Sequence, residues 1–265
     1  MSCPNCFKGE ILAGEPTGTI SDIQGAYYAQ SSEPSTRAVL LLTDIFGLPL
    51  KNSKILADFF AEQLKCDVWV PDLFDGKPPL AVHEMKFPER VGEKMGFFGY
   101  LSFIWLALRR IPLFIRSRPS VVDHRVATFI KKLQAEKKYE KIGAVGYCFG
   151  GNIAVRVGGT GLVDTIVVCH PGKLSTEQLK ALKVPSSWAC AEEDMSFTPA
   201  ARAAAEAELA GREGKANFVE YEFIDHKGTT HGFAARPNLA YPEVKAGFEA
   251  ALQQTVDWFK KTLLG

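Results

Sequence analysis

The sequence predicts an α/β fold in which a mostly parallel central sheet is covered by helices on both faces. Short runs of β-branched residues alternate with segments of helical periodicity along most of the chain. Parallel strands need long connections, which the helical segments supply. The 265 residues suit one domain of this class with a substantial core. We therefore expect a single domain over residues 1–265, with an insertion at about 75–120.

The expected strands are short apolar runs. They lie at 38–43, 67–70, 142–146, 165–168, 187–191 and 218–223. Segment 19–30 is expected to add an antiparallel hairpin at one edge of the sheet. Between the strands, apolar residues at three- and four-residue spacing predict the crossover helices. These helices are expected at 52–64, 121–133, 199–211 and 244–263.

One segment departs from this alternation. Within 72–120, two aromatic clusters and several prolines replace a simple crossover helix. Residues 121–133 already supply the crossover, so the sequence predicts that 97–115 form a lid, since binding residues commonly lie on such insertions. Its aromatic side chains, Phe103 and Trp105 among them, are expected to line an apolar pocket and bind the substrate. The alternative is a helix that packs only for stability.

Segment 141–157 is predicted to be a strand, a sharp turn and a helix, and its turn is Gly146-Tyr-Cys-Phe-Gly150-Gly151. A nucleophile elbow needs small residues beside its nucleophile, because its strained backbone brings strand and helix too close for side chains. The thiol of Cys148 would lie at the amino end of the helix, where the helix dipole favours a thiolate. A buried cysteine in a phosphate-binding turn is the alternative, but the pattern lacks both the dinucleotide glycine spacing and the Walker lysine. Cys148 is therefore the predicted nucleophile.

An α/β-hydrolase places its acid after a later strand and its histidine after the last strand. Strand 187–191 is followed by a loop that contains Glu192, Glu193 and Asp194. Asp194 is the predicted acid, and the two glutamates are alternatives. Each of the three would otherwise be a solvated loop residue.

Two of the five histidines lie in loop 225–233. His231 lies deeper in this loop, directly before Gly232, and is the predicted base. His226 immediately follows the expected strand and is predicted to be a surface residue. His170 ends another strand, so it either faces the site or is a structural loop histidine.

A tetrahedral intermediate needs two N–H donors aimed at its oxyanion. The amide of Phe149, which follows the nucleophile, is one candidate, and Ile45 in the turn after the first strong strand is the other. The expected mechanism begins when His231, oriented by Asp194, helps to ionise Cys148 for attack on a carbonyl. Water activated by the same histidine then releases the acid.

The composition excludes several other classes of function. With 31 basic and 30 acidic residues the formal charge is +1, so no overall field favours nucleic acid. The first eight residues contain no basic region followed by an apolar one, which predicts a cytoplasmic location rather than secretion. The six cysteines are scattered through the chain, and we expect them to remain thiols. The expected partner is a small molecule.

The longest apolar stretch is 97–108, which ends at Arg109. It is shorter than the roughly 20 residues that a membrane-spanning helix needs. No integral membrane segment is therefore expected. Peripheral contact of the same face with a membrane stays open as an alternative, because such helices also lie in interfaces.

Five motifs in this order resemble the dienelactone hydrolase family. They are Thr43-Asp-Ile-Phe-Gly47, Pro71-Asp-Leu-Phe74, the Gly146–Gly151 turn, Asp194, and His231-Gly-Phe233. The resemblance covers nearly the whole chain, and the cysteine in the turn is its specific part, since most α/β-hydrolases carry serine there. The opening Met-Ser-Cys-Pro-Asn-Cys looks like that of the fungal branch.

The resemblance implies a carboxylic ester hydrolase of the carboxymethylenebutenolidase type. It would open an enol-lactone or related small ester through an acyl-cysteine, with a triad of Cys148, Asp194 and His231 and with no metal or organic cofactor. The pair Cys3 and Cys6 has zinc-ligand spacing, but a structural zinc site needs four ligands and no second pair is evident.

Two further residues are implied by the same resemblance. In the bacterial enzymes a glutamate before the oxyanion-hole residue contacts the thiol, and Asp44 occupies that position here. Those enzymes also hold the substrate carboxylate with arginines, one of them four positions beyond the histidine. Here Ala235 stands at that position, followed by Arg236, which is the candidate substrate-binding residue.

Two rival functions remain. A thioesterase or acyl-transfer enzyme of a secondary pathway needs the same three side chains and differs only in its pocket. A catalytically silent small-molecule binding protein could share the fold, but an intact nucleophile, acid and base argue against it. Peptidase activity is less expected, because a thiolate suits the good leaving group of an enol ester better than that of an amide.

Overall fold

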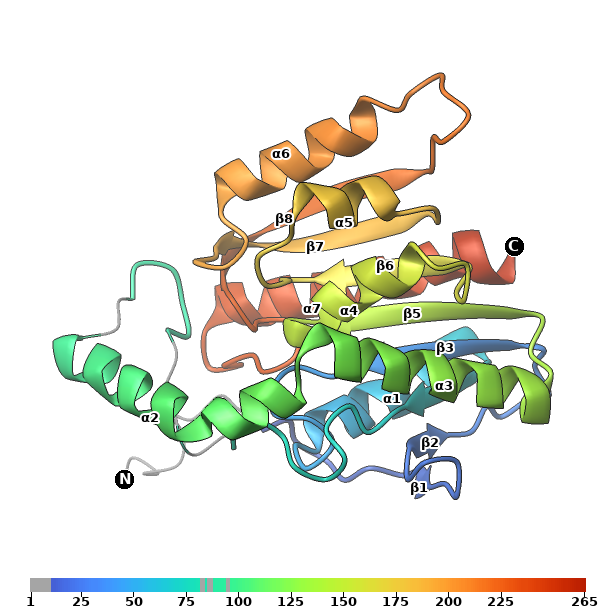
Figure 1. Cartoon of the computed structure of the whole chain (residues 1–265), viewed down its shortest axis with the longest axis horizontal. Helices are drawn as coiled ribbons and strands as arrows, with labels where there is room; N and C mark the ends of the chain where they lie inside the picture. Colours follow the sequence, from blue (N-terminus) through green and yellow to red (C-terminus); the bar gives the residue numbers. More distant parts are fainter. Residues whose placement is uncertain (1–10, 82–83, 85–87, 94–95) are drawn as a thin grey trace.

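The computed structural model describes residues 11–81, 84, 88–93 and 96–265. Within them, eight strands form one sheet in the order β1-β2-β4-β3-β5-β6-β7-β8. The strands from β4 to β8 in this order pair in parallel, whereas β1 and β2 are antiparallel to their neighbours. The expected fold class, a mostly parallel sheet with helices on both faces, is confirmed (Figure 1).

The strands agree closely with the apolar runs of the sequence, and the edge hairpin within 19–30 is present. Their bounds are β1 Thr19–Ile20, β2 Tyr27–Ala29, β3 Arg37–Leu42, β4 Asp67–Val70, β5 Lys141–Tyr147, β6 Thr165–Cys169, β7 Ser186–Glu193 and β8 Tyr221–Thr230. The expectation for the last strand was wrong, because β8 begins three residues later than 218 and continues through a polar segment to Thr230. That polar segment is ordered as a strand by pairing with β7, a long-range contact that carries no local apolar signal.

The helices also follow the periodic segments. Their bounds are α1 Asn52–Leu64, α2 Phe97–Arg116, α3 Pro119–Lys137, α4 Phe149–Gly158, α5 Thr176–Ala181, α6 Pro199–Ala210 and α7 Pro242–Phe259, which a short π-helix, η2 Lys260–Leu264, extends. In Figure 1, α3 to α6 lie in front of the sheet, and α1 and α7 lie behind it.

Each face of the sheet has its own apolar core. Leu40 of β3 packs with Phe129 of α3 on one face. The neighbouring residues Val39 and Leu41 pack with Phe60 of α1 on the other face. This alternation buries both sides of the central strands, as expected of a parallel sheet.

Helix α2 does not join either of these cores. It extends away from the body of the protein (Figure 1), and none of its residues is fully buried. The helix continues through Arg109 to Arg116, so it is longer than the apolar stretch 97–108 on which the sequence prediction rested. Among the described residues, α2 is the one helix long and apolar enough to cross a membrane by length and composition alone, which is weak evidence by itself.

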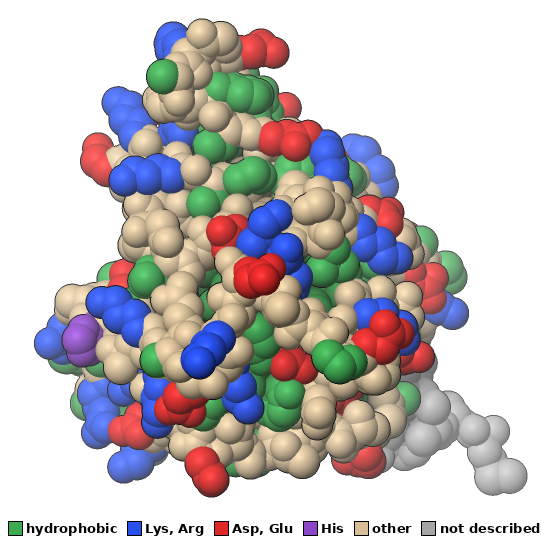
Figure 2. Space-filling model, turned by 90° about the vertical axis from the view of Figure 1, so that its right-hand side faces the viewer, with side chains coloured by type: hydrophobic (Ala, Val, Ile, Leu, Met, Phe, Trp, Pro, Cys, Tyr) green, Lys and Arg blue, Asp and Glu red, His purple; other side chains and the backbone are tan. Residues whose placement is uncertain are grey.

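Charged side chains of both signs are mixed on the face shown in Figure 2. This mixture fits the nearly balanced charge of the chain. A protein face of this kind has no single-sign field that would attract a large charged partner.

Candidate active site

The sharp turn from β5 into α4 is possible only because Gly146 of β5 and Gly150 of α4 have no side chains. A Cβ on Gly146 would lie 2.2 Å from the carbonyl oxygen of Gly150. A Cβ on Gly150 would lie 2.0 Å from the carbonyl oxygen of Leu42, at the end of β3. A backbone cannot yield to such contacts, so strand and helix approach this closely only without side chains. Gly151 has more room, with the nearest atoms of Pro171 at 3.2 Å.

Cys148 lies at the apex of this turn with a φ of +51°. A left-handed backbone is strained for a residue other than glycine, by about 1–3 kcal/mol. Backbone hydrogen bonds oppose the strain, since the Cys148 amide donates to the oxygen of Cys169 at 3.0 Å and the Cys148 oxygen accepts from the Asn152 amide at 3.3 Å. The thiol is therefore held at the amino end of α4, directly before its first residue.

The register of the last two strands brings the next two side chains together. Glu193 of β7 pairs with Thr230 of β8, after a register shift in which β8 carries the extra residues. Because the two strands are parallel, the residues that follow, Asp194 and His231, leave the sheet side by side at the same edge.

Cys148, His231 and Asp194 are joined in series by hydrogen bonds. His231 Nε2 lies 3.0 Å from Sγ of Cys148. His231 Nδ1 lies 2.8 Å from Oδ2 of Asp194. The other carboxylate oxygen of Asp194 accepts from the amides of Ser196 at 2.7 Å and Phe197 at 3.0 Å. The loop after β7 thus fixes the carboxylate, which in turn fixes the imidazole.

The electrostatics of this series favour a charged imidazole. Burial alone lowers the pKa of His231, but the negative charge of Cys148 and hydrogen bonds to Asp194 and Cys148 outweigh it and raise that pKa to about 10. Burial also raises the pKa of Asp194, but the hydrogen bond and charge of His231 hold it below its ordinary value. The arrangement can therefore hold a charged imidazolium between the Cys148 sulfur and the Asp194 carboxylate.

The two glutamates beside Asp194 have other partners. Glu192 accepts a hydrogen bond from the Gly228 amide at 2.7 Å, and Glu193 accepts one from the Gly92 amide at 2.9 Å. Of the three carboxylates in this segment, Asp194 is the one that binds His231.

His226 was expected at the surface, and this expectation was wrong. It lies within β8 and is buried. Its Nε2 lies 2.8 Å from the amide oxygen of Gln254 on α7, and its ring packs on Phe233 at 5.2 Å between centroids. The strand continues past residue 224, which turns this side chain into the protein.

His170 faces the site from the end of β6. Its ring is fully buried, at 5.1 Å from the ring of His231 and 5.6 Å from that of Phe233. Among the residues that the structure describes, neither of its ring nitrogens has a hydrogen-bond partner. Burial, together with the charge of His231, holds the pKa of His170 well below 6.5, so its ring is neutral. Of the two alternatives, the structure favours a histidine that contacts the site.

Asp44 and Arg236 form a buried ion pair, with Nε of Arg236 at 3.0 Å from Oδ2 of Asp44. The other carboxylate oxygen accepts from the Phe46 amide at 3.0 Å, and the guanidinium lies over the Phe46 ring. Burial raises the pKa of Asp44, and the guanidinium offsets part of this effect. The carboxylate thus binds Arg236 rather than the thiol, so the contact implied by the resemblance is absent among the described side chains.

The two expected oxyanion donors lie on adjoining segments. Phe149 is the first residue of α4, so its amide has no partner within the helix. Ile45 lies in the turn after β3, which closes with a hydrogen bond from the Gly47 amide to the Asp44 oxygen at 3.2 Å. The contact between Gly150 and the end of β3 brings these two segments together.

The structure does not bring Phe103 and Trp105 into this site. Phe103 is 40% exposed and Trp105 is 60% exposed, and Arg109 lies over the Trp105 ring at 4.5 Å. Phe103 lines an apolar pocket of about 430 Å³ that residues of α2 alone form, and no residue of the Cys148 group lines it. The binding of substrate by Phe103 and Trp105 therefore stays a prediction. The alternative, a helix packed only for stability, is not favoured, because α2 has no fully buried residue.

Another part of the insertion approaches the site instead. The Gly92 amide binds Glu193, and the Pro88 oxygen accepts from the Thr230 hydroxyl at 3.0 Å. Glu193 and Thr230 directly precede Asp194 and His231. The sequence gives no signal for these contacts, because residues 88–93 carry no periodicity or motif.

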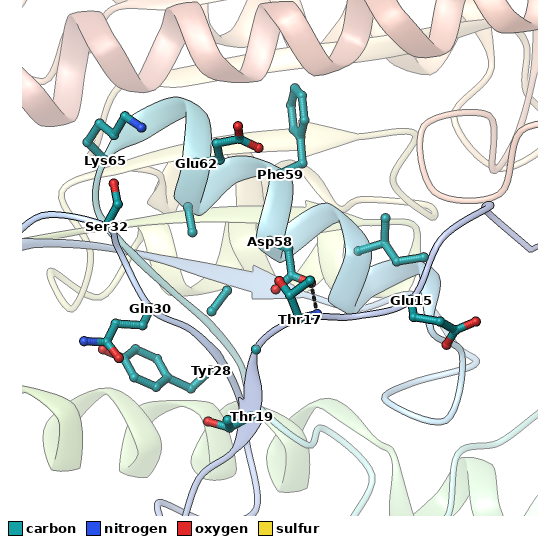
Figure 3. Close-up of a pocket in the computed structure, with 14 residues that line it drawn as sticks. Glu15, Thr17, Thr19, Tyr28, Gln30, Ser32, Asp58, Phe59, Glu62 and Lys65 are labelled. Atoms are coloured by element: carbon teal, nitrogen blue, oxygen red, sulfur yellow. Dashed lines mark hydrogen bonds between the residues drawn. The ribbon is translucent and has the colours of Figure 1, made fainter.

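The remaining candidates lie elsewhere. Cys3 and Cys6 fall outside the described residues. The four described cysteines are free thiols, as expected. A separate cleft of about 690 Å³ with a mixed polar and apolar lining lies between α1 and the edge hairpin (Figure 3). There Asp58 accepts hydrogen bonds from the Thr17 amide and the Tyr27 hydroxyl, both at 2.7 Å, and no residue of the Cys148 group lines this cleft.

Residues 108–263 match the sequence profile of the Dienelactone hydrolase family. The chain is 32% identical to Hydrolase tropI of Talaromyces stipitatus over 98% of this chain and 96% of the relative. It is 31% identical to Hydrolase pyvD of Aspergillus violaceofuscus, over 97% and 96%. Dienlactone hydrolase 1 of Gibberella moniliformis is 24% identical, over 96% and 91%.

Solved structures show the same fold. A dienelactone hydrolase from Anabaena variabilis superposes with a TM-score of 0.60 at 15% identity, over 94% of this chain and all of that one. A protein called m3DLH gives a TM-score of 0.60 at 18% identity, over 88% and 91%. At these identities the likeness concerns the fold alone.

Proposed function

Because this chain belongs to the dienelactone hydrolase family of hydrolases, we propose that it opens small lactones or activated esters through an acyl intermediate on Cys148. One observation carries the proposal. His231 bridges the Cys148 thiol at 3.0 Å and the Asp194 carboxylate at 2.8 Å. This is the geometry that an activated nucleophile, a base and an orienting acid require.

In the first half of the reaction, the Cys148 thiolate attacks the carbonyl carbon and a C–S bond forms. The amides of Ile45 and Phe149 are the proposed donors to the oxyanion. When the tetrahedral intermediate collapses, the ester C–O bond breaks and the His231 imidazolium gives its proton to the leaving oxygen. An acyl-cysteine and a neutral imidazole remain.

In the second half, the same histidine acts as a base. Acylation removes the charge of Cys148, which is the largest of the influences that raise the pKa of His231, while burial continues to lower it. The neutral imidazole can then take a proton from water as the water attacks the acyl carbon. The C–S bond breaks, the carboxylic acid leaves, and the thiolate–imidazolium pair is restored.

The charges beside the site support an uncharged ester as the substrate. Arg236, the candidate for binding a substrate carboxylate, is largely buried and paired with Asp44. The pair carries no net charge, and a buried guanidinium that loses its partner carboxylate is strongly disfavoured. A substrate carboxylate would therefore have to compete with Asp44.

A substrate panel tests this function. It contains an aryl acetate, a small neutral lactone, the same lactone with a carboxylate, and an acyl thioester of equal chain length. We expect turnover of the aryl acetate and the neutral lactone, with lower kcat/KM for the carboxylate and the thioester. Preferred turnover of the thioester would support the acyl-transfer rival, and no turnover of any compound would support a silent binding protein.

A further inference from the structure

Helix α2 exposes a large apolar surface. The side chains concerned are Phe97, Phe98, Tyr100, Leu101, Phe103, Ile104, Trp105, Leu108, Ile111, Phe114 and Ile115. Leu106 is the residue of this helix that packs on an apolar cluster of the body, formed by Phe46, Leu50 and Leu80. A contiguous exposed apolar surface of this kind marks a binding surface rather than ordinary surface variation.

The width of this surface indicates what covers it. At about 100° per residue, the exposed apolar side chains occupy an arc of about 220° around the helix. A helix that packs on one protein partner presents a stripe of roughly 100°. A single groove or a second helix would therefore leave much of the arc in water. A lipid phase surrounds a helix and can cover the whole arc.

The charged residues of the helix favour anionic lipid over neutral lipid. Residues 97–116 contain no aspartate or glutamate, whereas Arg109 and Arg110 lie on the arc that the apolar side chains leave and Arg116 lies at its edge. Arg110 pairs with Glu84, Arg116 lies 3.9 Å from Asp75, and Arg109 lies over Trp105. An apolar arc with tryptophan and tyrosine, bordered by arginines, is typical of helices that lie in the interface of anionic membranes.

The place of α2 in the fold fits a surface contact. Figure 1 shows α2 beyond the end of the sheet at which β5 leads into α4, the turn that carries Cys148. The chain as a whole carries a formal charge of +1, so attraction to anionic lipid is local to this helix.

We propose that α2 docks the protein on the surface of an anionic phospholipid bilayer, with its apolar arc in the interface and its arginines at the level of the headgroups. The helix lies on the membrane and does not span it, because Arg109 and Arg110 interrupt its apolar sequence and lie on its polar side. This proposal rests on α2 alone and does not depend on the chemistry at Cys148.

Trp105 makes the docking measurable without a label. Of the four tryptophans, Trp69, Trp188 and Trp258 are buried and Trp105 is 60% exposed. A blue shift of the fluorescence on addition of vesicles therefore reports on α2. We expect this shift, and co-sedimentation of the protein, with vesicles of 30% phosphatidylserine in phosphatidylcholine. Both should weaken in 0.5 M salt, because surface charges are then screened.

The test variant is Phe98→Glu with Leu108→Glu, since both side chains are at least 60% exposed and contribute nothing to the core. Phe218→Glu, an exposed phenylalanine outside α2, is the matched control. We expect the double variant to bind the anionic vesicles at least 10-fold more weakly and the control to bind like the wild type. Both should keep the wild-type melting temperature and the wild-type turnover of a soluble ester.

Two outcomes would overturn the proposal. One is the absence of vesicle binding by the wild-type protein at low salt. The other is a dimer of the wild-type protein in analytical ultracentrifugation that becomes a monomer in Phe98→Glu with Leu108→Glu, while vesicle binding is unchanged. A second copy of the chain would then cover α2. Vesicle binding with no ester turnover would leave the docking intact and count against the proposed function only.

Discussion

The Cys148 site and helix α2 differ in which side chains they expose to water. At the site, charged groups are withdrawn from water and satisfy one another through short hydrogen bonds. On α2, apolar groups stand in water with few partners in the described chain. Both arrangements cost free energy, one in backbone strain and desolvation and the other in exposed apolar surface. The difference teaches that Cys148, His231 and Asp194 find their partners within the chain, whereas the apolar side chains of α2 are left exposed.

If this comparison holds, changes at the site should alter chemistry and leave vesicle binding unchanged, and changes on α2 should do the reverse. The expected effects range from orders of magnitude at His231 to almost none at Phe103 for soluble substrates.

The largest expected effect distinguishes the two histidines of β8 and its following loop. His231→Ala should lower kcat/KM by about 10²–10⁴-fold, since it removes the general base. His226→Ala should keep kcat in the folded protein but lower its stability by about 1–3 kcal/mol, because the buried Gln254 amide loses its partner. Steady-state kinetics and thermal melts of both variants check this pair, and equal kinetic losses would contradict the assignment.

The protonation of His231 gives a second test. In the free enzyme its imidazole should stay charged at neutral pH and lose its proton only as the pH rises through about 10. In Cys148→Ala the pKa should fall, because the largest influence that raises it is gone and burial remains. Nitrogen NMR of the histidine ring measures both values. Titration near 6.5 in the wild type would show that the thiolate–imidazolium pair does not form.

A smaller effect is expected at His170, whose buried ring packs on His231. His170→Ala opens a space beside the imidazole, so kcat should fall about 10-fold through misplacement of the base, with little change in KM. His170→Phe keeps an aromatic ring at this position and has no buried nitrogen without a partner. It also has to adopt the positive φ of residue 170, +36°, as the histidine does. We therefore expect it to retain activity. If phenylalanine is as damaging as alanine, the nitrogens rather than the packing matter.

The smallest effect concerns the exposed aromatic residues of α2. Phe103→Ala and Trp105→Ala should change the relative kcat/KM among soluble esters of different chain length by less than about 2-fold, because surface substitutions usually matter little. A lid that lines the pocket would give about 10-fold or more, as apolar pocket changes are worth 1–3 kcal/mol. Kinetics on a series of acyl chains therefore distinguish a pocket wall from an outward-facing surface.

The sequence was sufficient to predict those parts of the site that a local steric rule determines. Gly146 and Gly150 flank Cys148 because no Cβ fits there, and this constraint is visible in the order of residues alone. The order of strands then placed Asp194 and His231 at one edge of a parallel sheet. The side-chain contacts of the site followed from these two facts.

The sequence was insufficient to predict the burial and partners of side chains that depend on contacts between distant parts of the chain. His226 is buried because a polar segment pairs with β7. Arg236 forms an ion pair with Asp44, which lies 192 residues away along the chain. Helix α2 continues past Arg109 because arginine is a good helix former, and its apolar composition does not say what it contacts.

The central claim is that turnover proceeds through an acyl group on Cys148. The most direct test is rapid quenching of the wild-type protein with an activated ester, followed by intact mass measurement and peptide mapping. We predict an increase equal to the acyl mass on the peptide that contains Cys148, decaying at a rate consistent with kcat, and no such species or turnover in folded Cys148→Ala. Turnover without an acylated Cys148, or at the wild-type rate in Cys148→Ala, would contradict the account.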